Sequence, residues 1–239
     1  MHRTTAPHNL SGMHTDGDAL ADVPRTIVNA DTMNTHQEEI ANAVLAAGLT
    51  LNPADQTQLL QAIKALASGK QTLWIPAGAL TPRTTNGPAS GTVETTTNKV
   101  MIKTLDFDAT TAEFAQFAVQ MPKSWNEGTV SALFVWSHAA TTTNFGVVWG
   151  IQGLAISDDD ALDAAFGTAQ TATDTGGTTN DLYRSPETSA VTIGGSPAEN
   201  DVVIFQVYRD ATNGSDTMAI DARFHGVALF FTTNSVSDA

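Results

Sequence analysis

The chain has 239 residues, of which 41% are hydrophobic and only 15% are charged, and its formal net charge is −14. The apolar fraction is sufficient for a folded core, while the acidic excess argues against nucleic acid or anionic lipid as a partner, because phosphate binding requires clusters of Lys and Arg. The absence of cysteine excludes disulfides and thiolate metal sites, and no apolar run approaches the ~18 residues expected of a membrane-spanning helix.

Residues 1–30 are predicted to form an extended arm. Prolines and glycines interrupt this segment and it has almost no periodic apolar pattern, so it would lack fixed structure by itself. We expect it to become ordered on a partner, with Arg3, Arg25, Ile27 and Val28 as the docking residues. The alternative is a tail that docks on nothing.

Residues 31–69 are predicted to form two short helices. The first begins with Asp31 as N-cap and ends before Gly48. The second opens with the Asn52-Pro53 pair, an amide cap followed by proline in the first turn, and stops at Ser68. Isolated helices of this length are marginally stable, so they must pack on the rest of the chain or on copies of themselves.

Apolar residues at helical spacing form a stripe on each of these helices. The positions Leu59, Ile63 and Leu66 match a short coiled-coil seam, which is compatible with a small parallel trimer. Three apolar positions do not fix the oligomeric state by themselves. The candidate oligomerisation residues are Ile40, Val44, Leu59, Ile63 and Leu66.

From residue 70 the hydrophobic period changes to two, which is typical of half-buried strands. Turn sequences separate the alternating runs, and no long helical pattern lies between them. The fold class is therefore mainly β, with residues 70–239 predicted to form an antiparallel, jelly-roll-like β-sandwich. The expected strands are Thr72–Ile75, Gly91–Glu94, Val100–Phe107, Glu113–Met121, Thr129–His138, Gly146–Ile156, Leu162–Thr171, Ala190–Ile193, Val202–Arg209 and Ala222–Thr232.

The chemical motifs of common enzymes are missing from the sequence. It has no Gly-x-Ser-x-Gly elbow, P-loop, dinucleotide fingerprint or zinc-ligand spacing. We therefore expect a protein that is not an enzyme and that has no cofactor and no metal site. The Asp-rich segments 158–163 and 210–216 leave two alternatives open, a solvated hairpin turn or a calcium site.

Trp125 is the candidate glycan-binding residue. It lies in the turn sequence Pro-Lys-Ser-Trp-Asn-Glu-Gly, where an exposed indole could stack on a sugar ring. The alternative is a tryptophan packed beneath its own turn. Trp136 and Trp149 lie within strand patterns and are expected in the core.

About the first quarter of the chain resembles the N-terminal module of bacteriophage tail-fibre and related virion-fibre proteins. The residues that carry this resemblance are Thr15–Asp18, Thr26–Asp31, Asn34 and, within residues 37–63, the pattern QEEI, AAGLTL, PAD and TQLLQAI. The β-rich part also resembles a domain of phage and gene-transfer-agent-like particles. The residues that carry this second resemblance are Trp74–Ala79, Leu105–Asp108, Phe117 and Pro122–Thr129.

The resemblance implies a structural component of a phage or phage-like particle located in the virion. The expected protein is a short trimeric head or tail fibre attached by its N-terminal arm to other virion proteins, with host-surface glycan as a further partner. From the acidic charge and the short apolar runs we expect no binding to nucleic acid and no membrane insertion. Two alternatives are a capsid decoration or connector protein without receptor binding, and a lectin-like glycan-binding module.

Overall fold

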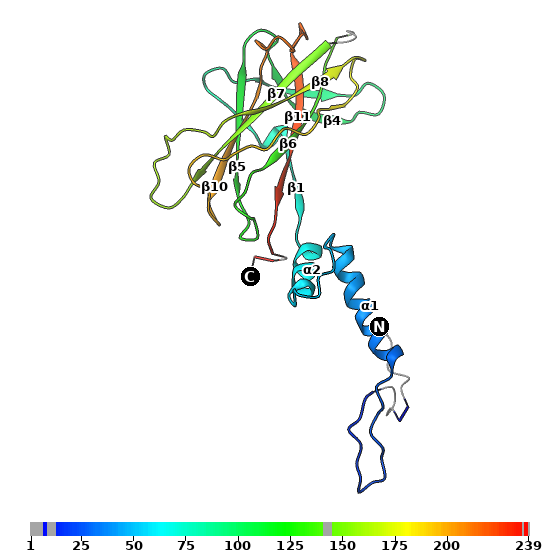
Figure 1. The fold of residues 1–239 in the computed structure, drawn as a ribbon. Helices are drawn as coiled ribbons and strands as arrows, with labels where there is room; N and C mark the ends of the chain where they lie inside the picture. The colour runs from blue at the N-terminus through cyan, green and yellow to red at the C-terminus, as the bar shows by residue number, and fades with distance from the viewer. Residues whose placement is uncertain (1–6, 9–12, 141–144, 236, 239) are drawn as a thin grey trace. The chain divides into compact units, whose positions relative to one another are not determined.

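The structure is a computed structural model that describes residues 7–8, 13–140, 145–235 and 237–238. The chain divides into two units, residues 1–68 and residues 69–239. The first contains two helices and the second contains the strands (Figure 1). Neither helix has the length and apolar content needed to cross a bilayer, within the residues that the structure describes.

The helices of the first unit are α1, Ala30–Ala46, and α2, Gln58–Ala67. The expected N-cap Asp31 is wrong by two positions: the Asn29 side chain accepts a hydrogen bond from Thr32 N at 3.0 Å, and Asp31 lies in the first turn. The second helix begins later than expected, because turns occupy residues 52–57. The Asn52 side chain stabilises them by accepting a bond from Ala54 N at 3.0 Å.

The two helices bury little of their apolar surface. Val44 and Ala62 are their buried aliphatic residues, at 1% and 0% exposure. Val44 is therefore enclosed within one chain, and the prediction that it contacts a second copy does not agree with its burial. The other four candidate oligomerisation residues are 39–57% exposed: Ile40, Leu59, Ile63 and Leu66.

The second unit is an antiparallel β-sandwich, which confirms the mainly-β prediction (Figure 1). One sheet has the order β3-β4-β11-β6-β9 with β1 also paired to β11, and the other has the order β2-β5-β10-β7-β8. The strands are β1 Lys70–Pro76, β2 Thr81–Pro82, β3 Ala89–Glu94, β4 Met101–Phe107, β5 Glu113–Gln120, β6 Ser131–Ser137, β7 Phe145–Ile156, β8 Gln170–Gly176, β9 Tyr183–Arg184, β10 Val202–Arg209 and β11 Ala222–Thr232; a 3₁₀ turn, Ala77–Ala79, follows β1.

Alternating side chains of the two sheets form the core. Phe107 and Trp149 come from opposite sheets and meet edge to face with ring centroids 5.2 Å apart. Phe224 packs 5.2 Å from Trp149. Trp136 and Trp149 are both 0% exposed, which confirms their expected place in the core.

Two expected strands are not formed as predicted. Residues 157–169 contain no strand, and β8 begins only at Gln170. Residues 190–193 contribute one isolated bridge, between Val191 and Val130. Both segments run close to other backbone: a Cβ on Gly167 would lie 2.0 Å from Thr192 O. Val191 and Ile193 are buried in the core without forming a regular strand, whereas Leu162 is exposed.

Candidate functional site

The outer face of the five-stranded sheet carries two rows of side chains that cross several strands. Because successive residues of a strand point to opposite faces, Ala115 and Phe117 of β5 face the core, while Phe114 and Gln116 face outward. The register pairs Phe114 and Gln116 with Tyr208 and Gln206 of β10. It then pairs these two with Gly150 and Gln152 of β7. We call Phe114–Tyr208 the aromatic row and Gln116–Gln206–Gln152 the amide row.

Glycine at position 150 determines the position of the Tyr208 ring. A Cβ at this position would lie 2.2 Å from Tyr208 Cζ and 2.6 Å from its hydroxyl oxygen, so the phenol lies directly against the β7 backbone. The Phe114 ring follows, with centroids 5.4 Å apart and an interplanar angle of 31°. The Arg83 guanidinium lies 4.6 Å from the Phe114 centroid, in cation–π range. These contacts hold the aromatic row in one orientation.

The amide row supplies paired donors and acceptors beside those rings. Gln116 Nε2 donates to Gln206 Oε1 at 2.9 Å, and Gln206 is only 4% exposed. Gln116 and Gln152 flank it and are partly exposed. Gln206 is thus a fixed central amide, and its neighbours present polar atoms to solvent.

The Tyr208 hydroxyl remains protonated at neutral pH. Burial, and secondarily the negative charge of Asp210, raises the pKa of Tyr208 above its usual value. A protonated phenol both donates and accepts hydrogen bonds. The aromatic row therefore ends in a neutral polar group, and Arg83 is its charged neighbour.

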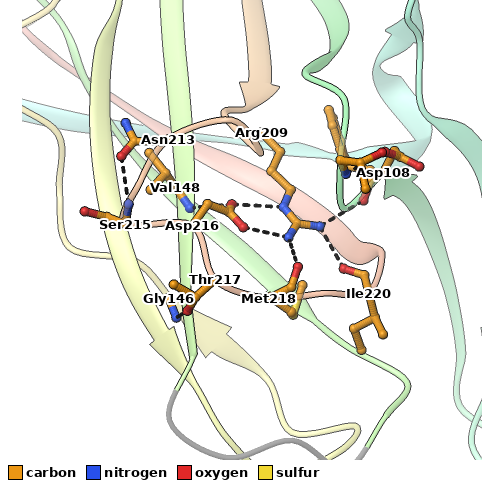
Figure 2. A network of polar contacts seen from close by, with 12 residues as sticks. Asp108, Gly146, Val148, Arg209, Asn213, Ser215, Asp216, Thr217, Met218 and Ile220 are labelled. Atoms are coloured by element: carbon orange, nitrogen blue, oxygen red, sulfur yellow. Dashed lines mark hydrogen bonds and ion pairs between the residues drawn. The ribbon is translucent and has the colours of Figure 1, made fainter.

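A buried ion pair supports this face from the core side (Figure 2). Arg209, next to Tyr208, is 0% exposed and donates to both Asp216 oxygens, from Nη2 at 2.7 Å and from Nε at 3.0 Å. Its guanidinium also donates to the carbonyls of Met218, Ile220 and Phe107 at 2.6, 2.8 and 3.3 Å.

Asp216 in turn fixes the 210–217 loop on β7. Its Oδ2 accepts from Val148 N at 3.0 Å, two residues from the glycine under Tyr208. The turn within this loop is closed by Ser215 N, which donates to Asn213 Oδ1 at 3.0 Å. Residues 210–216 therefore form a turn, and the Asp216 carboxylate in it is bound by Arg209.

The structure buries the predicted glycan residue Trp125 at 1% exposure. The prediction of a stacking role is corrected, because neither face of the indole is open to a sugar. The turn folds over it: Trp125 N donates to Pro122 O at 2.9 Å, and Trp125 forms a bridge with Thr233. The alternative of a packed turn is the one observed.

The other predicted site residues do not gather into one site. Arg3 lies outside the described residues, while Ile27 and Val28 are 55% and 52% exposed and Arg25 is exposed. The described part of the arm is not fully extended, since Asp18 and Val23 exchange backbone hydrogen bonds of 2.7 and 2.9 Å.

The Asp-rich segment 158–163 forms an ordinary turn in which Asp160 Oδ2 accepts from Ser157 N at 3.0 Å. Among the residues that the structure describes, no three His, Asp or Glu side chains are grouped as metal ligands.

Sequence reasoning missed both rows. The alternation in FAQFAVQ and VVIFQVYR placed aromatic and amide residues on a common face of each strand, but it did not indicate which face is open to solvent. The pairing of Tyr208 with Gly150 joins strands far apart in the sequence and leaves no local pattern.

No protein-family model matches the chain, and no curated protein matches it. Among solved structures, an arabinose-bound α-L-arabinofuranosidase aligns with a TM-score of 0.42 and 12% identity, covering 69% of this chain and 26% of that one. A xylan-binding domain from Paenibacillus barcinonensis gives 0.38 and 12%, covering 64% and 91%. A carbohydrate-binding module specific for non-crystalline cellulose gives 0.36 and 12%, covering 65% and 84%. At these TM-scores the likeness does not indicate what this chain binds.

Proposed function

We propose that the β-sandwich unit binds a neutral glycan chain along the outer face of its five-stranded sheet. One observation carries the proposal: the Tyr208 ring lies directly against Gly150, beside the hydrogen-bonded pair Gln116–Gln206. The exposed part of an aromatic ring packs against the C–H face of a pyranose, while amides exchange hydrogen bonds with its hydroxyl groups.

The charge of this unit favours an uncharged ligand. Residues 69–239 carry 18 acidic and 8 basic residues, a net charge of −10, and this field repels anionic glycans. The polar groups of the two rows are amides and a phenol, which suits neutral hydroxyl groups. The contact of Tyr208 with Gly150, its packing against Phe114 and the hydrogen bond between Gln116 and Gln206 already hold these side chains in place. Little rotamer freedom is therefore lost on binding.

The test is calorimetric titration of the full-length protein with soluble neutral polysaccharides, using xylan and mixed-linked β-glucan as probes. Tyr208→Ala should weaken binding by about five- to twelvefold, the effect of losing one ring contact of roughly 1–1.5 kcal/mol. The matched control is Trp74→Ala, which removes a 47% exposed aromatic from the other sheet. If Trp74→Ala abolishes binding and Tyr208→Ala does not, the glycan binds to the six-stranded sheet and the proposal is refuted.

We also propose, as a second function, assembly into a phage-like particle through the helical unit. The observation that favours it is the exposure of Leu59, Ile63 and Leu66 at 39%, 56% and 57%, since large aliphatic side chains are rarely left open in such a group. Light scattering after size exclusion tests this. A full-length trimer that becomes a monomer in Leu59→Asp/Ile63→Asp supports it, and a monomeric wild-type protein opposes self-assembly through the helices.

A further inference from the structure

A cleft of about 450 Å³ lies where β7 ends and β10 begins, at one end of the five-stranded sheet. We call it the strand-end cleft. Its apolar lining comes from Ile156, Leu162 and Val202, and its polar lining includes Asp158 and Asn200. The volume is within the usual range of small-molecule sites, about 300–1,000 Å³. The cleft shares no lining residue with the aromatic row or the amide row.

The strand-end cleft is on the same sheet face as the two rows. Val202, Gln206 and Tyr208 are separated by even numbers of residues along β10, so their side chains point to the same face. Val202 pairs with Ile156 of β7, and both side chains are at least partly exposed. At about 3.4 Å per residue, Val202 lies about 14 Å from Gln206 and about 20 Å from Tyr208 along the strand.

The surface between the amide row and the strand-end cleft is apolar and open. Ile204 of β10 pairs there with Ala118 of β5, and Ala118 is exposed while Ile204 is partly exposed. The neighbouring residue on β7, Leu154, is 2% exposed, and a Cβ on Gly195 would lie 3.2 Å from its Cδ1. A continuous route therefore runs over β5 and β10, with the chain at Gly195 beside it.

Hydrogen bonds hold the two loops that form the strand-end cleft. In the loop after β7, Ser157 N donates to Asp160 Oδ2 at 3.0 Å. In the loop before β10, Ala198 N donates to Asp201 Oδ2 at 2.8 Å, and Asp201 is 7% exposed. The Asp160 and Asp201 carboxylates therefore bind the backbone of their own loops, and the cleft is formed before any ligand arrives.

The groups that the strand-end cleft presents to solvent are of two kinds. Leu162 and Val202 are 80% and 43% exposed and provide apolar surface. Asp158 and Asn200 are also exposed; a carboxylate accepts hydrogen bonds, whereas an amide both donates and accepts them. Apolar surface beside open polar groups suits a sugar, which has a C–H face and a rim of hydroxyl groups.

We propose that the strand-end cleft is the far end of the glycan site, so that one chain contacts Tyr208, crosses the amide row and reaches Leu162 and Val202. This inference rests on the proposed function of the aromatic and amide rows. The ligand is then a linear oligosaccharide that spans about 20 Å of the sheet. The sugar unit in the cleft is uncharged, since the Asp158 carboxylate would repel an acidic sugar there.

Calorimetric titration of the full-length protein with disaccharide and hexasaccharide fragments of xylan and of mixed-linked β-glucan tests the length of the site. The hexasaccharide of at least one glycan should bind at least about tenfold more tightly than its disaccharide, because a disaccharide is too short to reach both Tyr208 and the cleft. Equal affinity for the two lengths would overturn the inference.

Two variants test the strand-end cleft itself. Leu162→Ala should weaken hexasaccharide binding by about five- to tenfold and leave disaccharide binding unchanged. Asn200→Gly should also weaken hexasaccharide binding; Asn200 has a φ of 66°, which glycine adopts without strain, so the change removes the amide and keeps the backbone. The matched control is Leu182→Ala, which truncates a 58% exposed leucine outside the cleft and should leave both affinities unchanged.

The variant Tyr208→Ala separates failure of this inference from failure of the proposed function. If Tyr208→Ala weakens hexasaccharide binding and neither cleft variant does, the rows bind glycan without the strand-end cleft, and only the inference is overturned. If no fragment binds, or if Tyr208→Ala leaves binding unchanged, the proposed function fails and the inference fails with it.

Discussion

Replacing Arg209 with methionine should destabilise the β-sandwich strongly. The change removes the donor to Asp216, which is itself 1% exposed, and leaves that carboxylate with Val148 N as its remaining donor in Figure 2. Breaking a buried ion pair in this way typically costs about 3–5 kcal/mol. The total stability of a domain is only about 5–15 kcal/mol. At roughly 2–4 °C per kcal/mol for a unit of this size, Tm should fall by roughly 6–20 °C.

Tryptophan fluorescence during urea and thermal unfolding measures this change in the full-length protein. All 4 tryptophans lie in residues 69–239, so the helical unit contributes no tryptophan signal. The matched control is Lys99→Met, which removes a surface pair whose side chains are 65% and 50% exposed; such pairs contribute about 0–1 kcal/mol.

The double variant Arg209→Met/Asp216→Asn tests the cause. It removes both charges and keeps an acceptor for Val148 N, so it should be more stable than Arg209→Met alone. If Arg209→Met costs less than about 1 kcal/mol, or if the double variant is no more stable than the single one, an uncompensated buried charge is not the reason.

Three further predictions concern the β-sandwich unit. Gly150→Ala should displace the Tyr208 ring, because the new Cβ would lie 2.2 Å from Tyr208 Cζ. Glycan affinity measured by calorimetry should fall at least about tenfold, and the free energy of unfolding should fall by about 1–3 kcal/mol. Unchanged affinity would contradict a role for that ring. Burial and the charge of Arg223 lower the pKa of His225 below its ordinary 6.5, so the unfolded chain binds a proton at this residue more readily than the folded chain does. The stabilising effect of a neutral His225 should therefore be lost as pH falls below 6.5. In urea unfolding, the free energy of unfolding should differ less between about pH 5 and about pH 7.5 in His225→Gln than in the wild-type protein. Trp125→Ala should destabilise the sandwich by about 3–5 kcal/mol and leave glycan affinity unchanged at temperatures where the variant is folded, whereas lost affinity would revive the stacking role that its burial excludes.

The candidate site could be predicted from the sequence only in part. The period of two placed Phe114 with Gln116, and Gln206 with Tyr208, on common strand faces. It did not show that the rows lie side by side, because strand pairing depends on contacts between residues about 90 positions apart, as in Gln116–Gln206. The position of Trp125 in a turn-forming sequence suggested exposure, yet backbone bonds fold that turn over the core.

The elements that depend on local chemistry can be predicted from the sequence alone. Helical spacing and the glycine after the first helix produced α1, and alternation with intervening turn residues produced the antiparallel sandwich. Which strand faces are covered, and which side chains meet, depends on how distant segments pack in the folded chain. The ring of Tyr208 lies on Gly150, and the carboxylate of Asp216 meets Arg209 in the interior. The physical reason is that burial and register arise from packing between distant segments, whereas periodicity and turn preference are properties of neighbouring residues.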